Sequence, residues 1–222
     1  MIAGVVVVAV LVGGAAVADG VARERTEERV ADELRAGIPG LDATPDVTID
    51  GFPFLTQVLA GSMGSVVVTA PSATFDGLRL DGVDVRLTGV STSLPTTAGV
   101  AEMTADVSLA SIQEVLDVPV DLTIEDNTFL VTASLFGVPL TVTLTALPAG
   151  RTIEVEPETV SLGGLTVSAD DLPAGLTDQI DDIAIPVESL PEGMELTGLT
   201  VGAGGVTLEA WGTDVVFDEL PS

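Results

Sequence analysis

Apolar and polar residues alternate along most of the chain between residues 120 and 155. Apolar residues occupy every second position in the runs 120–124, 129–135 and 138–144, and most positions between them hold Thr, Ser or Asp. A period of two places each set on one face of a β-strand. Asp126-Asn127 and Phe136-Gly137 separate the runs and favour tight turns. We therefore expect a meander of antiparallel strands with one dry face and one threonine-rich face.

The same alternation occurs earlier in the chain, but there it changes parity. Apolar residues fall on even positions in 78–80 and on odd positions in 83–87, with Asp81-Gly82 between them. This change predicts a β-bulge or a tight turn at Asp81-Gly82. The threonine-rich segment 92–98 contains Pro95 and is expected to be a loop.

Two segments have helical spacing instead. Residues 19–36 are densely charged around a thin apolar stripe, and residues 108–116 place Ile112, Val115 and Leu116 on one side. A short helical turn is expected in the acidic segment 170–182, before a final pair of strands. The predicted fold class is α+β: a strongly curved antiparallel sheet, a cup or half-barrel, wrapped on one or two helices and preceded by an N-terminal hydrophobic helix.

The N-terminal run of residues 2–18 contains only apolar or small residues. A membrane-spanning helix needs about 20 such residues, with a lower limit near 17. Ala16-Val17-Ala18 resembles a signal-peptidase site, although no basic residue precedes the run. We predict that residues 1–22 are a signal peptide or membrane anchor and that residues 23–222 form a single domain. A buried core helix is the less favoured interpretation, because the run lacks an amphipathic period.

Residues 47–61 join an expected strand to a short amphipathic turn through an aromatic corner. Gly51 and Pro53 interrupt the strand, and Phe52 and Phe54 are two of only six phenylalanines in the chain. The turn that follows carries its apolar residues at helical spacing, at Leu55, Val58 and Leu59. Two interpretations are open: the corner plugs one end of a β core, or its Phe-Pro-Phe tip lines a lipid pocket or the mouth of one.

The sequence Gly51-Phe52-Pro53-Phe54-Leu55-Thr56-Gln57, followed by Leu59-Ala60-Gly61, resembles the signature of the LmeA family of phospholipid-binding proteins from the actinobacterial cell envelope. The order of an apolar N-terminus, a charged helix, this motif and then short strands is similar as well, over residues 19–217. The resemblance implies phospholipid binding and a role in envelope lipoglycan (mannan) assembly. It implies no catalytic residue.

The charge of the chain narrows the range of partners. Its net charge is −27, with 34 acidic residues, seven arginines and no lysine. Phosphate backbones are bound by Lys and Arg, so nucleic acid is not expected as a partner. Steering onto an anionic membrane by charge is also disfavoured. The acidity itself is explained by solubility, or by a salt-rich habitat.

The composition also limits the chemistry. The chain has no cysteine and no histidine, which excludes thiol or imidazole nucleophiles and their metal sites. The aspartates of segment 170–182 lack the spacing of known calcium loops, so no metal site is predicted. A pair of carboxylates for hydrolysis is the remaining catalytic option, and 34 acids make chance pairs unavoidable. We expect no enzymatic activity and no cofactor.

Apolar recognition is the chemistry that remains. The candidate lipid-binding residues are the corner, the apolar side of the second helix and one strand residue: Phe52, Pro53, Phe54, Leu55, Val58, Leu59, Ile112, Leu116 and Phe129. Three arginines outside the first helix are head-group candidates, Arg79, Arg86 and Arg151. The alternative for these arginines is that they are scattered charges on outer strand faces.

We therefore predict an extracytoplasmic, anchored or exported monomer that binds phospholipid in an apolar cavity and contacts the membrane through its N-terminal segment. The alternative is a non-catalytic adhesion or scaffolding module of the envelope, which binds a protein or a glycan.

Overall fold

The computed structural model describes residues 2–38, 40–75, 77–116, 120–135, 137–171, 183–187 and 190–217, without the side chains of residues 2–17, 135 and 183. Within these residues the structure has three α-helices, α1 (Ile2–Gly37), α2 (Phe54–Ala60) and α3 (Leu109–Val115). A 3-10 turn, η1 (Ala169–Asp171), begins the acidic segment, and the rest of the helical turn expected in 170–182 lies outside the described residues.

The strands form two antiparallel sheets of six strands each. The first sheet has the order β1-β2-β3-β4-β12-β11, with β1 (Asp46–Asp50), β2 (Ser62–Phe75), β3 (Leu78–Ser91), β4 (Thr96–Ser108), β12 (Gly205–Phe217) and β11 (Glu192–Gly202). The second sheet has the order β10-β8-β7-β6-β5, with β9 paired to β8; its strands are β5 (Asp121–Glu125), β6 (Thr128–Leu135), β7 (Val138–Ala149), β8 (Thr152–Leu162), β9 (Leu165–Ser168) and β10 (Ile183–Pro186).

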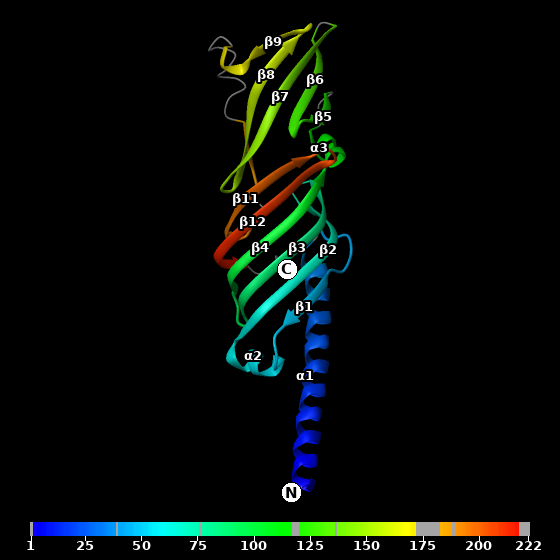
Figure 1. Ribbon diagram of the computed structural model, residues 1–222, viewed down its shortest axis with the longest axis vertical. Coiled ribbons are helices and arrows are strands. Elements are labelled where there is room, and N and C mark those ends of the chain that lie inside the picture. The colour runs from blue at the N-terminus through cyan, green and yellow to red at the C-terminus, as the bar shows by residue number, and fades with distance from the viewer. Residues whose placement is uncertain are drawn as a thin grey trace.

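The predicted α+β class and the antiparallel pairing are confirmed, and neither sheet closes into a barrel. The strands divide into two sheets where one was expected. Figure 1 shows these sheets end to end along the long axis, with α1 beside the first sheet and projecting beyond it. Among the described residues, the main-chain bridge between the sheets pairs Gly150 with Leu196, whose N–H donates to the Gly150 carbonyl at 2.7 Å.

The turns follow the residue types that the sequence places there. Asp126 and Asn127 have positive φ angles of 50° and 63°, as the tight hairpin between β5 and β6 requires. The predicted parity change in β3 is also confirmed, since the register to β4 shifts between Asp81 and Asp84. The expected loop 92–98 is shorter in the structure, because β4 begins at Thr96.

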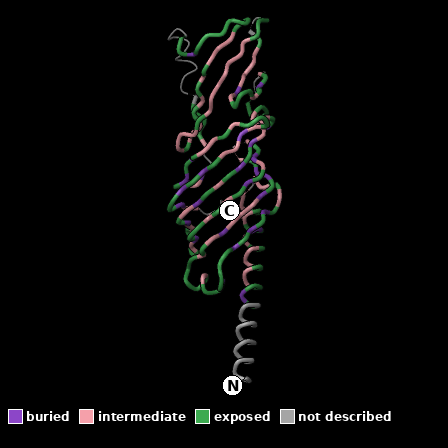
Figure 2. The backbone as a smooth tube through the Cα atoms, viewed as in Figure 1, coloured by how far each residue is buried: buried purple, intermediate pink, exposed green. Residues whose placement is uncertain are grey.

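The buried core lies mainly in the first sheet, as Figure 2 shows. Its apolar clusters are continuous, because Leu87 and Met103 each pack against more than one of them. The C-terminal half of α1 covers one end through Ala31, Val30 and Leu34. The first sheet is therefore packed on α1 at one end, whereas the single cup or half-barrel expected from the sequence is replaced by two open sheets.

α1 is a single helix of 36 residues that includes the charged segment 19–36 predicted to be helical and ends one residue after it, at Gly37. Within the part of the chain that the structure describes, no helix has both the length and the hydropathy needed to cross a bilayer. The predicted signal peptide or anchor falls mostly on residues 1–17, whose side chains lie outside the description. That role stays a prediction.

Candidate functional site

The second sheet gathers apolar side chains on one face. Paired residues of neighbouring strands share a face, so the register defines apolar rows across the sheet. These rows, which we call the open apolar face, are Leu122-Val131-Val142-Val160-Val167, Ala133-Leu140-Leu162-Leu165, Ile124-Phe129-Leu144 and Ala146-Val155. The alternation of apolar and polar residues in the sequence thus produces an apolar surface several strands wide.

The opposite face of the same sheet is lined with hydroxyl groups. The Thr132 and Thr141 hydroxyls are 3.2 Å apart, and the Thr159 hydroxyl donates to Thr143 at 3.0 Å. These pairs connect neighbouring strands and satisfy polar groups on a face that no other described element of the chain covers. The second sheet is therefore two-sided, with apolar and polar surfaces separated by one layer of backbone.

The open apolar face is only partly covered. Among its described residues, only Leu122 and Phe129 are buried, and both lie next to the first sheet. Leu165 is 79% exposed and Leu162 45% exposed, while no residue of β7 is buried. Soluble monomers rarely leave a contiguous apolar surface of this kind open, unless a lipid or another partner covers it.

A shared apolar cluster joins this face to the first sheet. Leu122 and Phe129 of the second sheet pack with Val206 of β12, and Ile112 of α3 packs against the same cluster. Two predicted lipid-binding residues, Ile112 and Phe129, therefore meet at this junction. Leu116 follows α3 directly and remains exposed. The open face is thus continuous with the core of the first sheet.

The aromatic corner lies at the other end of the first sheet, beside α1 (Figure 1). Its two phenylalanines have opposite environments: Phe54 is 2% exposed, and Phe52 is 70% exposed. Phe54 packs with Ala31, Val47 and Ile49 in the core. An apolar cavity behind the corner is not confirmed, because packed side chains surround Phe54. Pro53, Leu55, Val58 and Leu59 are all exposed.

The carboxylate of Asp19 holds the corner in place. The backbone N–H groups of Phe54 and Leu55, in the first turn of α2, each donate to Asp19 at 2.8 Å. The pKa of Asp19 is held below its ordinary value, most strongly by the hydrogen bond from Leu55. The hydrogen bond from Phe54 and the Arg23 guanidinium also lower this pKa, whereas burial acts in the opposite direction. Asp19 thus connects α1 to α2 across 35 positions of sequence.

This contact predicts a pH-dependent stability. A carboxyl group whose pKa is lowered by folding stabilises the protein fully above its unfolded pKa of about 3.9. The stabilisation is lost as the pH falls through the lower folded value. We expect Asp19→Asn to lower the thermal unfolding midpoint at pH 7, and the gap to the unsubstituted protein to close below about pH 4. Circular dichroism melts from acidic to neutral pH measure this gap. The control is Asp121→Asn, since Asp121 is exposed. A difference in unfolding midpoint between Asp19→Asn and the unsubstituted protein that stays constant with pH would contradict the stabilising role of the Asp19 carboxylate.

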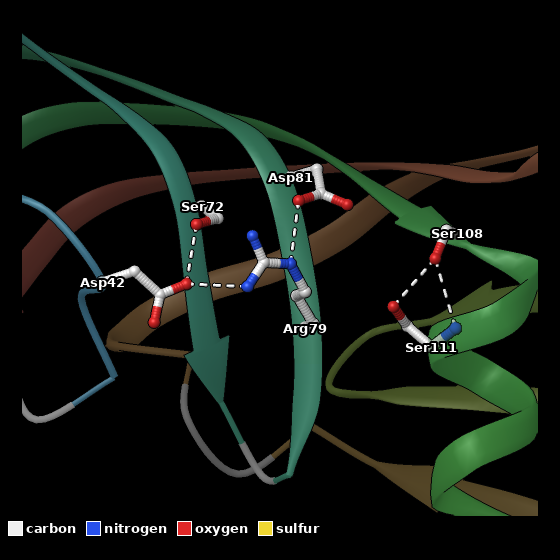
Figure 3. Close-up of polar contacts among 6 residues, drawn as sticks. All are labelled: Asp42, Ser72, Arg79, Asp81, Ser108 and Ser111. Atoms are coloured by element: carbon white, nitrogen blue, oxygen red, sulfur yellow. Dashed lines mark hydrogen bonds and ion pairs between the residues drawn. The ribbon is translucent and has the colours of Figure 1, made fainter.

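The three head-group arginines do not form one site. Arg79 is in ion pairs with Asp42 at 2.9 Å and with Asp81 at 3.2 Å, and Figure 3 shows this arrangement. Arg151 donates to the main-chain carbonyls of Leu190, Pro191 and Met194. Arg86 is exposed in the middle of β3. Their part in binding a head group stays a prediction.

Two further polar features lie outside the apolar surfaces. The Asp42 carboxylate accepts from the Ser72 hydroxyl at 2.7 Å, and this bond, followed by Arg79, lowers the pKa of Asp42. An open hollow of about 490 Å³ lies between α1 and β1 and is lined by Glu24, Glu27, Glu28, Asp32 and Asp46, among others. Its acidic lining does not suit an acyl chain.

Sequence reasoning missed two features of the candidate site. The apolar residues of β7 and β8 were recognised as one strand face, but nothing in the alternation shows whether another layer covers that face. Asp19 was missed because its hydrogen-bond partners are remote in sequence. The only local signal for Asp19 is its position as the first charged residue after the apolar run.

A wide apolar face that is only partly covered, and continuous with a core at one end, is typical of proteins that bind an apolar ligand, a membrane or a protein partner. The comparison with protein families names the ligand more closely. The model of the LmeA-like phospholipid-binding family matches residues 17–210, and the chain belongs to this family. The family assignment supports lipid binding. No curated protein and no solved structure matches the chain.

Proposed function

We propose that the chain binds phospholipid by laying acyl chains along the open apolar face of the second sheet. The observation that carries this proposal is the partial exposure of that face, from Leu140 and Val142 in its middle to Leu165 at its edge. Family membership supplies the ligand class. The site in this proposal is an open surface and differs from the enclosed cavity that the sequence suggested.

The dimensions of the sheet suit this ligand. β7 has 12 residues, and a rise of about 3.4 Å per residue gives it a length of roughly 40 Å. One leaflet of a bilayer core is about 15 Å thick, so an acyl chain fits along the strand. Each methylene removed from water contributes about 0.8 kcal/mol, so the affinity is set by the length of acyl chain that the sheet covers. The hydroxyl face behind the sheet keeps the other side compatible with water.

The cellular setting is proposed on separate grounds. The apolar run 2–18 and the family support an exported or anchored protein of the cell envelope. There we propose a role in lipid handling or in lipoglycan (mannan) assembly, carried out by binding and without catalysis. The head group is proposed to lie at the edge of the sheet, because the apolar rows offer it no hydrogen-bond partner.

Native mass spectrometry of the full chain, purified from a phospholipid-containing host, tests the proposal. We expect adducts with phospholipid masses, and uptake of labelled phospholipid from vesicles when the protein is first stripped. Absence of both would overturn the proposal. If the protein instead forms complexes with envelope proteins or glycans, the adhesion or scaffolding alternative is favoured.

A further inference from the structure

A second apolar surface lies at the opposite end of the molecule from the open apolar face. It consists of Phe52 and of Leu55, Val58 and Leu59 of α2, which we call the α2 tip. Leu59 is 89% exposed and Phe52 70% exposed, and Leu55 and Val58 are exposed as well. Leu55, Val58 and Leu59 have the spacing i, i+3 and i+4, so they share one side of the helix. Phe54 alone in α2 is buried.

The α2 tip is held at one level of α1. Asp19 accepts hydrogen bonds from the first turn of α2, and the Arg23 guanidinium donates to the Gly51 carbonyl at 2.7 Å. Asp19 is also the residue at which the apolar run 2–18 ends. The α2 tip therefore lies beside the boundary between the apolar and the charged part of α1 (Figure 1).

We propose that the α2 tip inserts into the surface of a phospholipid bilayer, the membrane that the predicted anchor in residues 1–22 would enter. Apolar helix faces of this kind bury about 5–10 Å deep at the boundary between head groups and acyl chains. The proposal concerns a surface separate from the open apolar face, so it does not depend on the proposed lipid-binding function.

The charges on α1 agree with this position. Arg23 and Arg25 follow Asp19 by four and six residues, which places them about 6 and 9 Å further along the helix axis, within reach of lipid phosphates. Glu24, Glu27 and Glu28 are interleaved with them, so net charge does not drive the contact. Apolar insertion is the driving force, and zwitterionic vesicles are therefore the suitable probe.

The absence of native cysteine allows a direct test with single labels. The full chain carries an environment-sensitive fluorophore at Leu59→Cys or, as the matched control, at Thr104→Cys, which is exposed on β4 of the first sheet. Both proteins are reconstituted with phosphatidylcholine vesicles that contain a spin-labelled quencher lipid. We expect a blue-shifted emission and severalfold stronger quenching at position 59 than at position 104. A water-like, unquenched label at position 59 on vesicle-bound protein would overturn the proposal, as would failure of the protein to float with the vesicles.

A second variant separates insertion from simple nearness to the membrane. The label is moved to Leu55→Cys, with and without Leu59→Asp, which introduces a charge into the α2 tip. Insertion predicts that Leu59→Asp reduces quenching at position 55 severalfold, while circular dichroism remains unchanged because residue 59 is outside the core. Equal quenching in the two proteins would show that the tip is merely held close and would overturn the proposal. Lipid adducts in native mass spectra report independently on the open apolar face.

Discussion

Val142→Asp is expected to remove co-purifying phospholipid from the protein while leaving it folded. Val142 lies in the middle of the open apolar face, paired with Val131 on β6 and Val160 on β8. In the lipid-free protein the new carboxylate stays in contact with water, because residue 142 is partly exposed. An acyl chain laid over this position would bury the charge, at a cost of several kcal/mol. Since about 1.4 kcal/mol is a tenfold change in affinity, we expect binding at least about 100-fold weaker.

The matched control is Thr141→Asp, one residue earlier on the hydroxyl face. Its carboxylate can still accept a hydrogen bond from Thr132, whose hydroxyl contacts Thr141 in the structure. Lipid content by native mass spectrometry and vesicle uptake should therefore be retained in Thr141→Asp and lost in Val142→Asp. If both variants retain the lipid content of the unsubstituted protein, the lipid is bound elsewhere. If both lose it equally, charge on the sheet has a general effect that does not depend on the face.

Phe54→Ala should destabilise the protein strongly, whereas Phe52→Ala should not. Phe54 is buried among Ala31, Val47 and Ile49, and truncating a buried Phe to Ala costs about 3–5 kcal/mol. For a chain of 222 residues, this loss corresponds to a fall in the unfolding midpoint on the order of 10 °C. The exposed Phe52 makes no comparable contribution. Thermal unfolding followed by circular dichroism measures both variants.

This pair of variants also separates the two interpretations of the aromatic corner. If Phe54 lined a lipid pocket, Phe54→Ala would reduce lipid content more than stability. The packing around Phe54 favours the reverse: a lower unfolding midpoint and, at a temperature where the protein is folded, unchanged lipid content. A lipid-depleted but fully stable Phe54→Ala protein would restore the pocket behind the corner.

The strand pattern of this fold was predictable from sequence because one face of each strand is apolar. The alternation in 120–144 predicted β5, β6 and most of β7, and the parity change at Asp81-Gly82 predicted the bulge in β3. Alternation does not specify which strand edges remain unpaired. The chain divides into two sheets joined by the Gly150–Leu196 bridge, and no local pattern encodes that bridge.

The candidate site was predictable only in part. The motif around Phe52 and Phe54 led to the family, which the family model confirms. Composition and spacing did not show that these two rings have opposite environments, because that depends on the packing of α1 against β1. Arg151 illustrates the same limit, since its carbonyl partners lie about 40 residues away in sequence.

The single-layered second sheet has a consequence for local unfolding. Its amides are protected by strand pairing but, over most of β7, by no buried side chain. Segments of this kind open at a lower free energy than a packed core and exchange their amide hydrogens sooner. A ligand that binds only the closed form raises the free energy of opening in proportion to the logarithm of its concentration. Lipid seated on this sheet would therefore serve as the second layer of its core, so that occupancy and local order rise and fall together.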